Sequence, residues 1–306
     1  MAVSTRLLSL GRELDTGPDA FGEPVRSDDC VDQPDVLRAR LETDGYLFIP
    51  GFFDRELISA ARGSLTDRLA AAGLLDPESP AIEARARAGK LPAVPADIAQ
   101  HNPALDRVIY GPELIGFYEN LFGESVRHFD HTWVRVVPHG HGSPPHCDIV
   151  YMGRGTHQLL TCWIPYGEVP LEVGGLMVLE GSHRQSDRLK NYLELDVDQY
   201  CENRSRDVEK VRVQGGWSHR QNGSLTNNPV SLREKMGGRW LTTHWQPGDF
   251  ITFRMTLIHA SLDNQTDCIR LSTDTRYQRA SQPADARWVG VNPAGHGPRA
   301  KQGLIC

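Results

Sequence analysis

The chain has 306 residues, of which 39% are hydrophobic and 24% charged, a composition typical of a globular protein with a sizeable core and not of a disordered one. The 33 basic and 39 acidic residues give a formal net charge of −6, which argues against a nucleic acid as the main partner. No apolar run reaches the roughly 18 residues that a membrane span requires, and the N-terminal apolar stretch is too short for a secretion signal.

The cysteines give no sign of a disulfide framework, a zinc site or a redox motif, because they are scattered without paired spacing. They are Cys30, Cys147, Cys162, Cys201, Cys268 and Cys306. Reduced thiols are therefore expected, which indicates a cytoplasmic protein.

The first part of the chain predicts an arm followed by a helix and a strand. Residues 1–34 lack clear periodicity and contain several glycines and prolines, so we expect a loosely ordered arm. A short helix is predicted from Asp35, and the apolar run 46–49 predicts a strand that ends at Pro50-Gly51.

Two longer helices are predicted next. Asp54 is a suitable N-cap for a helix to about Ala72, because apolar residues recur at helical spacing behind it. Residues 76–100 are rich in proline and alanine and are interpreted as a solvated loop or, alternatively, as a lid over a site. Pro112 opens a further helix, for which Gly123 is the expected C-cap.

Beyond residue 125, short apolar segments alternate with turn residues, a pattern that favours a sandwich or a jelly roll. The predicted strands lie near 126–137, 148–152, 158–166, 176–179, 210–213, 240–245, 249–254 and 268–277. The polar and loop-like stretch 181–239 is interpreted as an insertion that lies over the barrel mouth as a specificity lid. No internal boundary divides 35–278, which is expected to be one domain, and the tail 279–306 is expected to be peripheral.

The tripeptide His146-Cys147-Asp148 is the first candidate for chemistry. If it lies on a strand, the histidine and the carboxylate project from the same side. A second histidine from a distant strand would complete a facial triad that holds a divalent iron and leaves the opposite face open. His259 ends an apolar segment and is the candidate for that ligand, although a histidine in this position is often a satisfied core residue.

Arg270 lies eleven residues after His259, on the next predicted strand. Ile269 and Leu271 flank it, so its side chain should point to the opposite face, which is the interior of a jelly roll. A guanidinium in that interior requires an anion, and its donors match both oxygens of a carboxylate. The alternative is an ordinary surface salt bridge.

These residues together resemble the phytanoyl-CoA dioxygenase family of iron(II)- and 2-oxoglutarate-dependent oxygenases. The resemblance covers about residues 35–278 and implies a mainly β fold, a double-stranded β-helix (a cupin-like jelly roll) with flanking helices. The segments that carry it are 44–53, 145–148, 161–165, 174–183, 248–250, 259–261 and Arg270.

The resemblance implies that His146, Asp148 and His259 are the catalytic iron(II) ligands. Relatives that halogenate replace the carboxylate ligand with a small residue, so Asp148 favours hydroxylation. The residue between the first two ligands, often glutamine in the family, is Cys147 here, and the glutamine's co-substrate contact does not carry over.

The resemblance also implies 2-oxoglutarate and O2 as co-substrates. Arg270 matches the arginine that binds the distal carboxylate of 2-oxoglutarate, with Ser261 beside it. Trp163 matches a family tryptophan near the co-substrate, and its alternative is a core aromatic.

Substrate contacts are the least defined part of the site. Trp133 and Arg135 share one face of a predicted strand and are candidates for the pocket wall. Arg276 lies on the same face as Arg270 and is a candidate for an anionic substrate, or else forms an ordinary ion pair.

The expected function is therefore hydroxylation of an unactivated C–H bond of a small molecule, such as a natural product, a lipid or an amino-acid-like compound. The same cofactors also support desaturation, epimerisation and ring formation, which the sequence does not separate. Two alternatives of other classes are a non-catalytic cupin-like metal sensor and a zinc hydrolase, since zinc accepts the same ligands. An interior Arg270 argues against the hydrolase.

Overall fold

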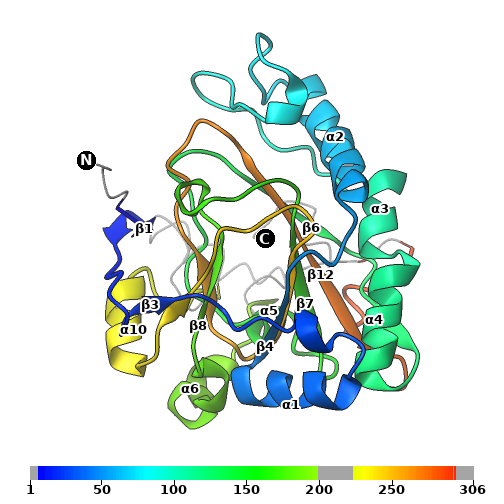
Figure 1. The fold of residues 1–306 in the computed structure, drawn as a ribbon, viewed down its shortest axis with the longest axis vertical. Coiled ribbons are helices and arrows are strands. Elements are labelled where there is room, and N and C mark those ends of the chain that lie inside the picture. The colour runs from blue at the N-terminus through cyan, green and yellow to red at the C-terminus, as the bar shows by residue number, and fades with distance from the viewer. Residues whose placement is uncertain (1–5, 199–222, 292, 294–306) are drawn as a thin grey trace, which may run out of the picture.

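The protein, described here by a computed structural model over residues 6–198, 223–291 and 293, is built on two β-sheets that face each other (Figure 1). Apolar side chains from both sheets meet in one cluster between them, for example Trp163 and Ile251 from one sheet and Val178 from the other. The described strands do not join the two sheets into a closed hydrogen-bonded barrel. The expected class, mainly β with flanking helices in a jelly-roll arrangement, is confirmed.

The larger sheet has six strands in the order β4-β10-β7-β12-β5, with β6 also paired to β12. Every pair in this sheet is antiparallel. The strands are β4 (Tyr46–Ile49), β5 (Val126–His128), β6 (Trp133–Val137), β7 (Leu160–Pro165), β10 (Phe250–Arg254) and β12 (Arg270–Arg279).

The smaller sheet has four strands in the order β11-β8-β9-β3, of which β3 runs parallel to β9. Its strands are β3 (Phe21–Gly22), β8 (Leu176–Leu179), β9 (Trp240–Leu241) and β11 (His259–Ser261). A separate hairpin pairs β1 (Leu8–Ser9) with β2 (Arg12–Glu13).

Four helices flank the larger sheet on its outer side (Figure 1). They are α1 (Pro34–Asp44), α2 (Arg55–Ala71), α3 (Pro103–Ile109) and α4 (Pro112–Phe122). As predicted, Asp54 caps α2 by accepting a hydrogen bond from the Glu56 amide, and Gly123 ends α4 with φ +73°. That left-handed conformation favours glycine.

The remaining helices are short. They are α5 (Ile149–Met152), α6 (Ser186–Leu193) and α10 (Pro229–Met236), with the 3-10 turns η1 (Asp28–Cys30), η2 (Ala81–Glu83), η3 (Leu171–Val173) and η4 (Ser182–Arg184). In the described part of the 181–239 insertion, α6 and α10 flank the smaller sheet (Figure 1). No described helix is long and apolar enough to cross a membrane.

Strand alternation determines which side chains face the space between the sheets. On β4, Leu47 and Ile49 pack toward the helices, whereas Tyr46 and Phe48 pack between the sheets. The same rule places Ile269 and Leu271 on the helix side and leaves Arg270 on the inner side, as predicted.

Several predicted strands differ from the structure. The predicted strand 148–152 is instead the helical turn α5, Ile149–Met152, with Asp148 as its N-cap in the αR conformation. The segment 126–137 divides into β5 and β6, and only Trp240–Leu241 of 240–245 is a strand. The predicted strand 210–213 lies outside the described residues.

The described parts of the predicted arm and tail are more closely packed than expected. In the predicted arm, Leu7 and Leu14 are buried, and the Asp263 side chain accepts hydrogen bonds from two amides of the β1–β2 turn at 2.8 and 2.7 Å. In the predicted tail, Trp288 is 1% exposed and packs on Trp133. Burial of these apolar side chains explains the difference.

Candidate active site

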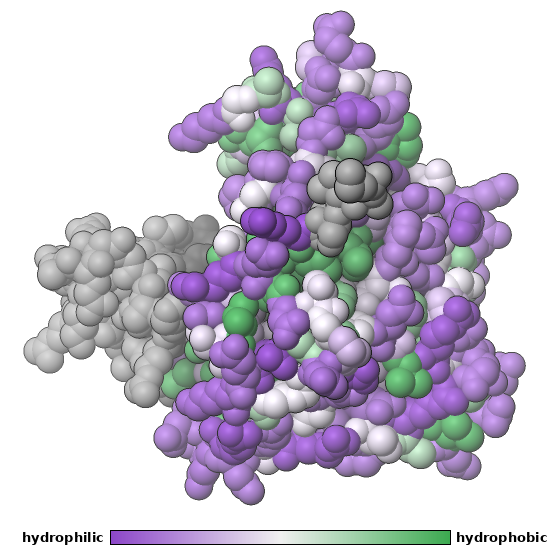
Figure 2. All heavy atoms as spheres, turned by 60° about the vertical axis from the view of Figure 1, so that its left-hand side comes forward, coloured by the Kyte–Doolittle hydropathy of each residue, from purple (hydrophilic) through white to green (hydrophobic). Residues whose placement is uncertain are grey.

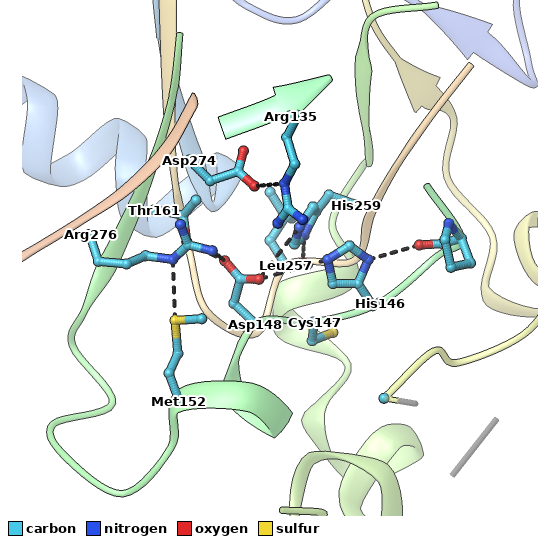
Figure 3. A network of polar contacts seen from close by, with 12 residues as sticks. Arg135, His146, Cys147, Asp148, Met152, Thr161, Leu257, His259, Asp274 and Arg276 are labelled. Atoms are coloured by element: carbon cyan, nitrogen blue, oxygen red, sulfur yellow. Dashed lines mark hydrogen bonds and ion pairs between the residues drawn. The ribbon is translucent and has the colours of Figure 1, made fainter. Parts of the chain in front are cut away.

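The two candidate histidines and the candidate aspartate meet at the inner side of β11 (Figure 3). His146 pairs with His259 through two backbone hydrogen bonds of 3.0 Å, which brings the imidazole centroids to 4.1 Å. The Nε2 atoms of His146 and His259 lie 3.8 and 3.7 Å from Oδ1 of Asp148. One ligand atom from each residue therefore lies within 4.8 Å of the others, a spacing that suits one metal ion.

The reason for this convergence differs from the one predicted. Asp148 is not on a strand with His146, because the chain enters the helical turn α5 at this residue. The turn, rather than strand alternation, directs the carboxylate toward the histidines.

Both imidazoles are held in the tautomer that a metal requires. Nδ1 of His146 donates to the Pro144 carbonyl at 2.8 Å, and Nδ1 of His259 donates to the Leu257 carbonyl at 3.1 Å. Nε2 of each ring is then left with its lone pair toward Asp148. Burial, followed by the charge of His259, lowers the pKa of His146 to about 3, and burial also lowers the pKa of His259. Neutral imidazoles are the form that binds metal.

The Asp148 carboxylate is oriented by two donors on its second oxygen. Oδ2 accepts from the Thr161 hydroxyl and pairs with Nη2 of Arg276 at 3.0 Å, which leaves Oδ1 facing the histidines. Burial alone would raise the pKa of Asp148, but the Arg276 charge, the two histidines and the Thr161 hydrogen bond hold it below its usual range. The carboxylate is therefore ionised and points one oxygen at the metal position.

Arg276 is itself enclosed by the protein. Its guanidinium lies 4.6 Å from the centroid of the Trp133 ring, its Nε contacts the Met152 sulfur at 3.2 Å, and the residue is 2% exposed. Nη2 of Arg276 forms the ion pair that the sequence offered as the alternative, and contact of Arg276 with an anionic substrate stays a prediction.

Arg270 is equally buried but differs from Arg276 in its partners. It is 3% exposed, its Nη1 donates to the Gly174 carbonyl, and its Nε has no hydrogen-bond partner in the described part of the chain. Among the described residues, no carboxylate lies within ion-pair distance of it, and burial lowers its pKa to about 10, so it remains charged at neutral pH. Two residues further along the same inner face, the buried Ser272 hydroxyl also has no hydrogen-bond partner among the residues that the structure describes.

The donors of Arg270 and Ser272 that have no partner among the described residues show whether the site fits a dicarboxylate. A buried guanidinium without a counter-ion costs several kcal/mol, which a bound carboxylate would offset. Arg270 and Ser272 therefore fit the distal carboxylate of 2-oxoglutarate, and the triad fits iron(II).

The other two predicted co-substrate residues are placed less specifically. Trp163 is buried between the sheets against Trp245, with ring centroids 4.9 Å apart, so it has the packing of a core aromatic. The Ser261 hydroxyl accepts a hydrogen bond from the Ser143 amide at 2.8 Å. No hydrogen bond between Ser261 and Arg270 occurs in the described part of the chain.

Trp133 and Arg135 share the inner face of β6, as predicted. Val134 and Val136, which alternate with them, pack toward the helices. Trp133 covers Arg276, and Nε of Arg135 donates to Oδ2 of Asp274 at 2.5 Å. Both inner side chains are partly exposed.

Cys147 points away from the metal position. Its thiol is buried and donates to the Thr256 carbonyl at 3.4 Å, and burial raises its pKa. Its backbone amide donates to the hydroxyl of Tyr192 at 3.0 Å, and that hydroxyl donates to the Gly223 carbonyl.

Three residues of the site were not predicted from the sequence, namely Thr161, Asp274 and Tyr192. Asp274 could have been found from the sequence, because side chains on β12 alternate between two faces. Asp274 lies on the same face as Arg270 and Arg276, between them. Thr161 alternates with Trp163 and faces Arg276 across the β7–β12 pair. The role of Tyr192 had no sequence signal.

Comparisons with known proteins agree with this site. Residues 41–272 match the family model of phytanoyl-CoA dioxygenase (PhyH). The chain is 26% identical over 274 residues to 1-deoxypentalenic acid 11-beta-hydroxylase of Streptomyces exfoliatus, covering 86% of this chain and 87% of the relative.

Solved structures share the fold. EctD from S. alaskensis in its apoform has a TM-score of 0.57 and 18% identity, over 93% of this chain and 89% of that one. The non-heme alpha ketoglutarate dependent epimerase SnoN from nogalamycin biosynthesis has a TM-score of 0.53 and 20% identity, over 87% and 94%. At these identities the likeness concerns the fold alone.

The family match spans most of the chain and includes the whole His-Asp-His cluster and Arg270. The chain belongs to the phytanoyl-CoA dioxygenase family and is a non-heme oxygenase that depends on iron(II) and 2-oxoglutarate.

Proposed function

We propose that the protein hydroxylates an unactivated C–H bond of a small molecule. The observation that carries this proposal is the buried, unpaired Arg270 on the same inner face of β12 as Arg276, which holds Asp148. Arg270, with Ser272, would bind the distal carboxylate of 2-oxoglutarate, whose other end would reach the iron. Trp163 would form part of the wall beside it, and Ser261 stays a predicted neighbour of the co-substrate.

The chain's own residues prepare the site for this reaction. His146, His259 and Asp148 would hold iron(II) on one face, which leaves the opposite positions for the co-substrates. With both bound, one oxygen atom of O2 enters the C–H bond of the substrate and the other enters succinate, with release of CO2. Apolar side chains between the sheets, such as Phe253 and Leu257, exclude water from the triad.

Two findings favour hydroxylation over the related outcomes. Asp148 keeps the carboxylate in the ligand set, which argues against halogenation. Two relatives, at 26% and 25% identity, are both named as hydroxylases. Epimerisation and ring closure remain the second candidates, since an epimerase and a carbocyclase share the fold.

We also propose that the described parts of the predicted 181–239 insertion, 181–198 and 223–239, act as a lid over a single oxygenase domain, 35–278; residues 199–222 lie outside the described residues. Supporting this, the Tyr192 hydroxyl connects the first described part of the insertion to Cys147, beside the triad, and to Gly223 in the second part. We further propose a cytoplasmic location with reduced thiols. Cys30, Cys147, Cys162 and Cys268 are free in the structure.

The test is turnover with small-molecule extracts of the source organism. The purified protein is supplied with iron(II), 2-oxoglutarate and O2, and mass spectrometry follows succinate and any compound that gains one oxygen atom. We expect stoichiometric succinate and oxygenated product, and neither with Arg270→Met at the same co-substrate concentration. Metal binding without any turnover would instead favour the sensor. A product without the gained oxygen would favour epimerisation or ring closure.

A further inference from the structure

A third arginine near the triad, Arg135, pairs with no metal ligand and lies opposite Ser272 on the neighbouring strand. Arg135 extends from β6 toward the triad beside His259 (Figure 3). Its side chain is 41% exposed, so it is reachable from solvent, unlike Arg270 and Arg276.

Asp274 orients this guanidinium and leaves one of its edges available. The carboxylate of Asp274 accepts from Nε of Arg135 at 2.5 Å. No hydrogen bond joins either Nη atom of Arg135 to another residue of the described chain. The Nη1–Nη2 edge of a guanidinium presents two parallel N–H donors, the geometry that binds a carboxylate through both oxygens.

The surroundings of that edge are aromatic. Trp133 lies two residues away on the same strand face, with its ring over Arg276. Tyr151 lies against His146, with ring centroids 5.6 Å apart, and both aromatic residues are partly exposed. One oriented cation among aromatic faces suits a ligand with an apolar body and a single anionic group.

The charges between the sheets favour an anion. Among the described residues, the inner faces of β6 and β12 and the triad carry five charged side chains. The three arginines 135, 270 and 276 and the two aspartates 148 and 274 together leave one positive charge. Divalent iron and the dianion of 2-oxoglutarate cancel each other. The loaded site therefore keeps one positive charge that a monoanionic substrate would neutralise.

We propose that Arg135, oriented by Asp274, binds the carboxylate of the substrate, and that the substrate is an apolar monocarboxylic acid. The inference rests on the proposed oxygenase function and deepens it by naming the substrate class. With its carboxylate at Arg135, the acid places its hydrocarbon body beside Trp133 and over the triad. Oxygenation then occurs at a carbon remote from the carboxylate.

The experiment compares two forms of one small-molecule extract of the source organism. One half is untreated, and in the other half the carboxylic acids are converted to methyl esters, which removes their charge. We expect the wild-type enzyme to produce a compound that gains one oxygen atom only in the untreated half, and we expect that product to be an acid. An oxygenated product that persists after esterification would overturn the proposal.

Variants locate the carboxylate at Arg135. Arg135→Gln should raise the KM for the isolated acid by about 10- to 100-fold, the effect of losing a charge-assisted pair, while the KM for 2-oxoglutarate stays within about twofold. Arg135→Lys should restore part of the loss. Arg239→Gln is the matched control, because Arg239 is 39% exposed and paired with Glu180, and should leave both KM values unchanged.

The outcomes are separable. A rise in the KM for 2-oxoglutarate alone would show that Arg135 holds the co-substrate and would refute the assignment. An unchanged KM for the acid in Arg135→Gln would also refute it. No oxygenation in either half of the extract, with no succinate, would count against the oxygenase function itself.

Discussion

Two arginines on one strand face show how differently the same side chain is used at the two ends of this site. Arg270 and Arg276 lie six residues apart on the inner face of β12, and both are nearly fully buried. Arg276 has a carboxylate partner in the chain, Asp148 at 3.0 Å, and an aromatic ring over it. Among the described residues, Arg270 has only the Gly174 carbonyl as a partner, and its Nε has none.

The presence or absence of a carboxylate partner within the chain distinguishes a positioning arginine from a ligand-binding one. Removal of one partner of a buried ion pair leaves an uncompensated charge, so the pair must be kept for the chain itself to be stable. A buried arginine without a counter-ion is costly for the chain alone, and the cost is recovered only when an anion binds. Arg276 thus serves the metal ligand, and Arg270 serves the co-substrate.

The largest effect is expected at the carboxylate that Arg276 holds. Asp148→Asn keeps the shape of the side chain but removes the charge that faces His146 and His259. We expect turnover to fall to background and iron content, measured by elemental analysis of anaerobically loaded protein, to drop sharply. Full turnover would show that Asp148 is not a metal ligand, and Arg276 would then have no metal ligand to orient.

The next effect concerns Arg276. Arg276→Met leaves Asp148 buried without a charge partner, so the free energy of unfolding of the metal-free protein should fall by about 3 kcal/mol in urea denaturation. Iron affinity should fall by about 10- to 100-fold, as for other residues that orient a metal ligand. Arg276→Lys should recover part of the iron affinity. A merely structural residue would lower stability without changing iron affinity in the folded protein.

Arg270 should behave in the opposite way in the same denaturation experiment. Arg270→Met removes a buried charge that has no carboxylate partner among the described residues, so the metal-free protein should be as stable as wild type or more stable, by up to about 2 kcal/mol. A loss as large as that of Arg276→Met would show that Arg270 has a structural partner and would remove the contrast between the two arginines.

The smallest effect is expected at Cys147, which lies between two ligands but faces the core. Cys147→Ala should lower the free energy of unfolding by about 1 kcal/mol through lost packing, with iron and 2-oxoglutarate affinities unchanged. A change in either affinity would place the thiol in the site, contrary to its contact with the Thr256 carbonyl.

Much of the site could be predicted because it depends on alternation along single strands. The inner direction of Arg270 followed from Ile269 and Leu271, and the shared face of Trp133 and Arg135 followed in the same way. These relations need no knowledge of which strands pair.

What could not be predicted depends on pairing over long sequence distances and on local turns. Arg276 meets Asp148 because β12 pairs with β7 in a register that sets Arg276 opposite Thr161. No pattern within either strand determines that register. Asp148 faces the histidines through a helical turn that its apolar neighbours, Ile149 and Val150, made to look like a strand.

The most direct test of the central claim is a titration of 2-oxoglutarate into the iron(II)-loaded protein without oxygen, followed by the visible charge-transfer absorption of the complex. Wild type should bind 2-oxoglutarate, and Arg270→Met should bind it about 30- to 100-fold more weakly, because one charge-assisted carboxylate contact is lost. Arg239→Gln, which loses an ion pair at the surface, should bind as wild type does. Equal affinity in Arg270→Met and wild type would contradict the account.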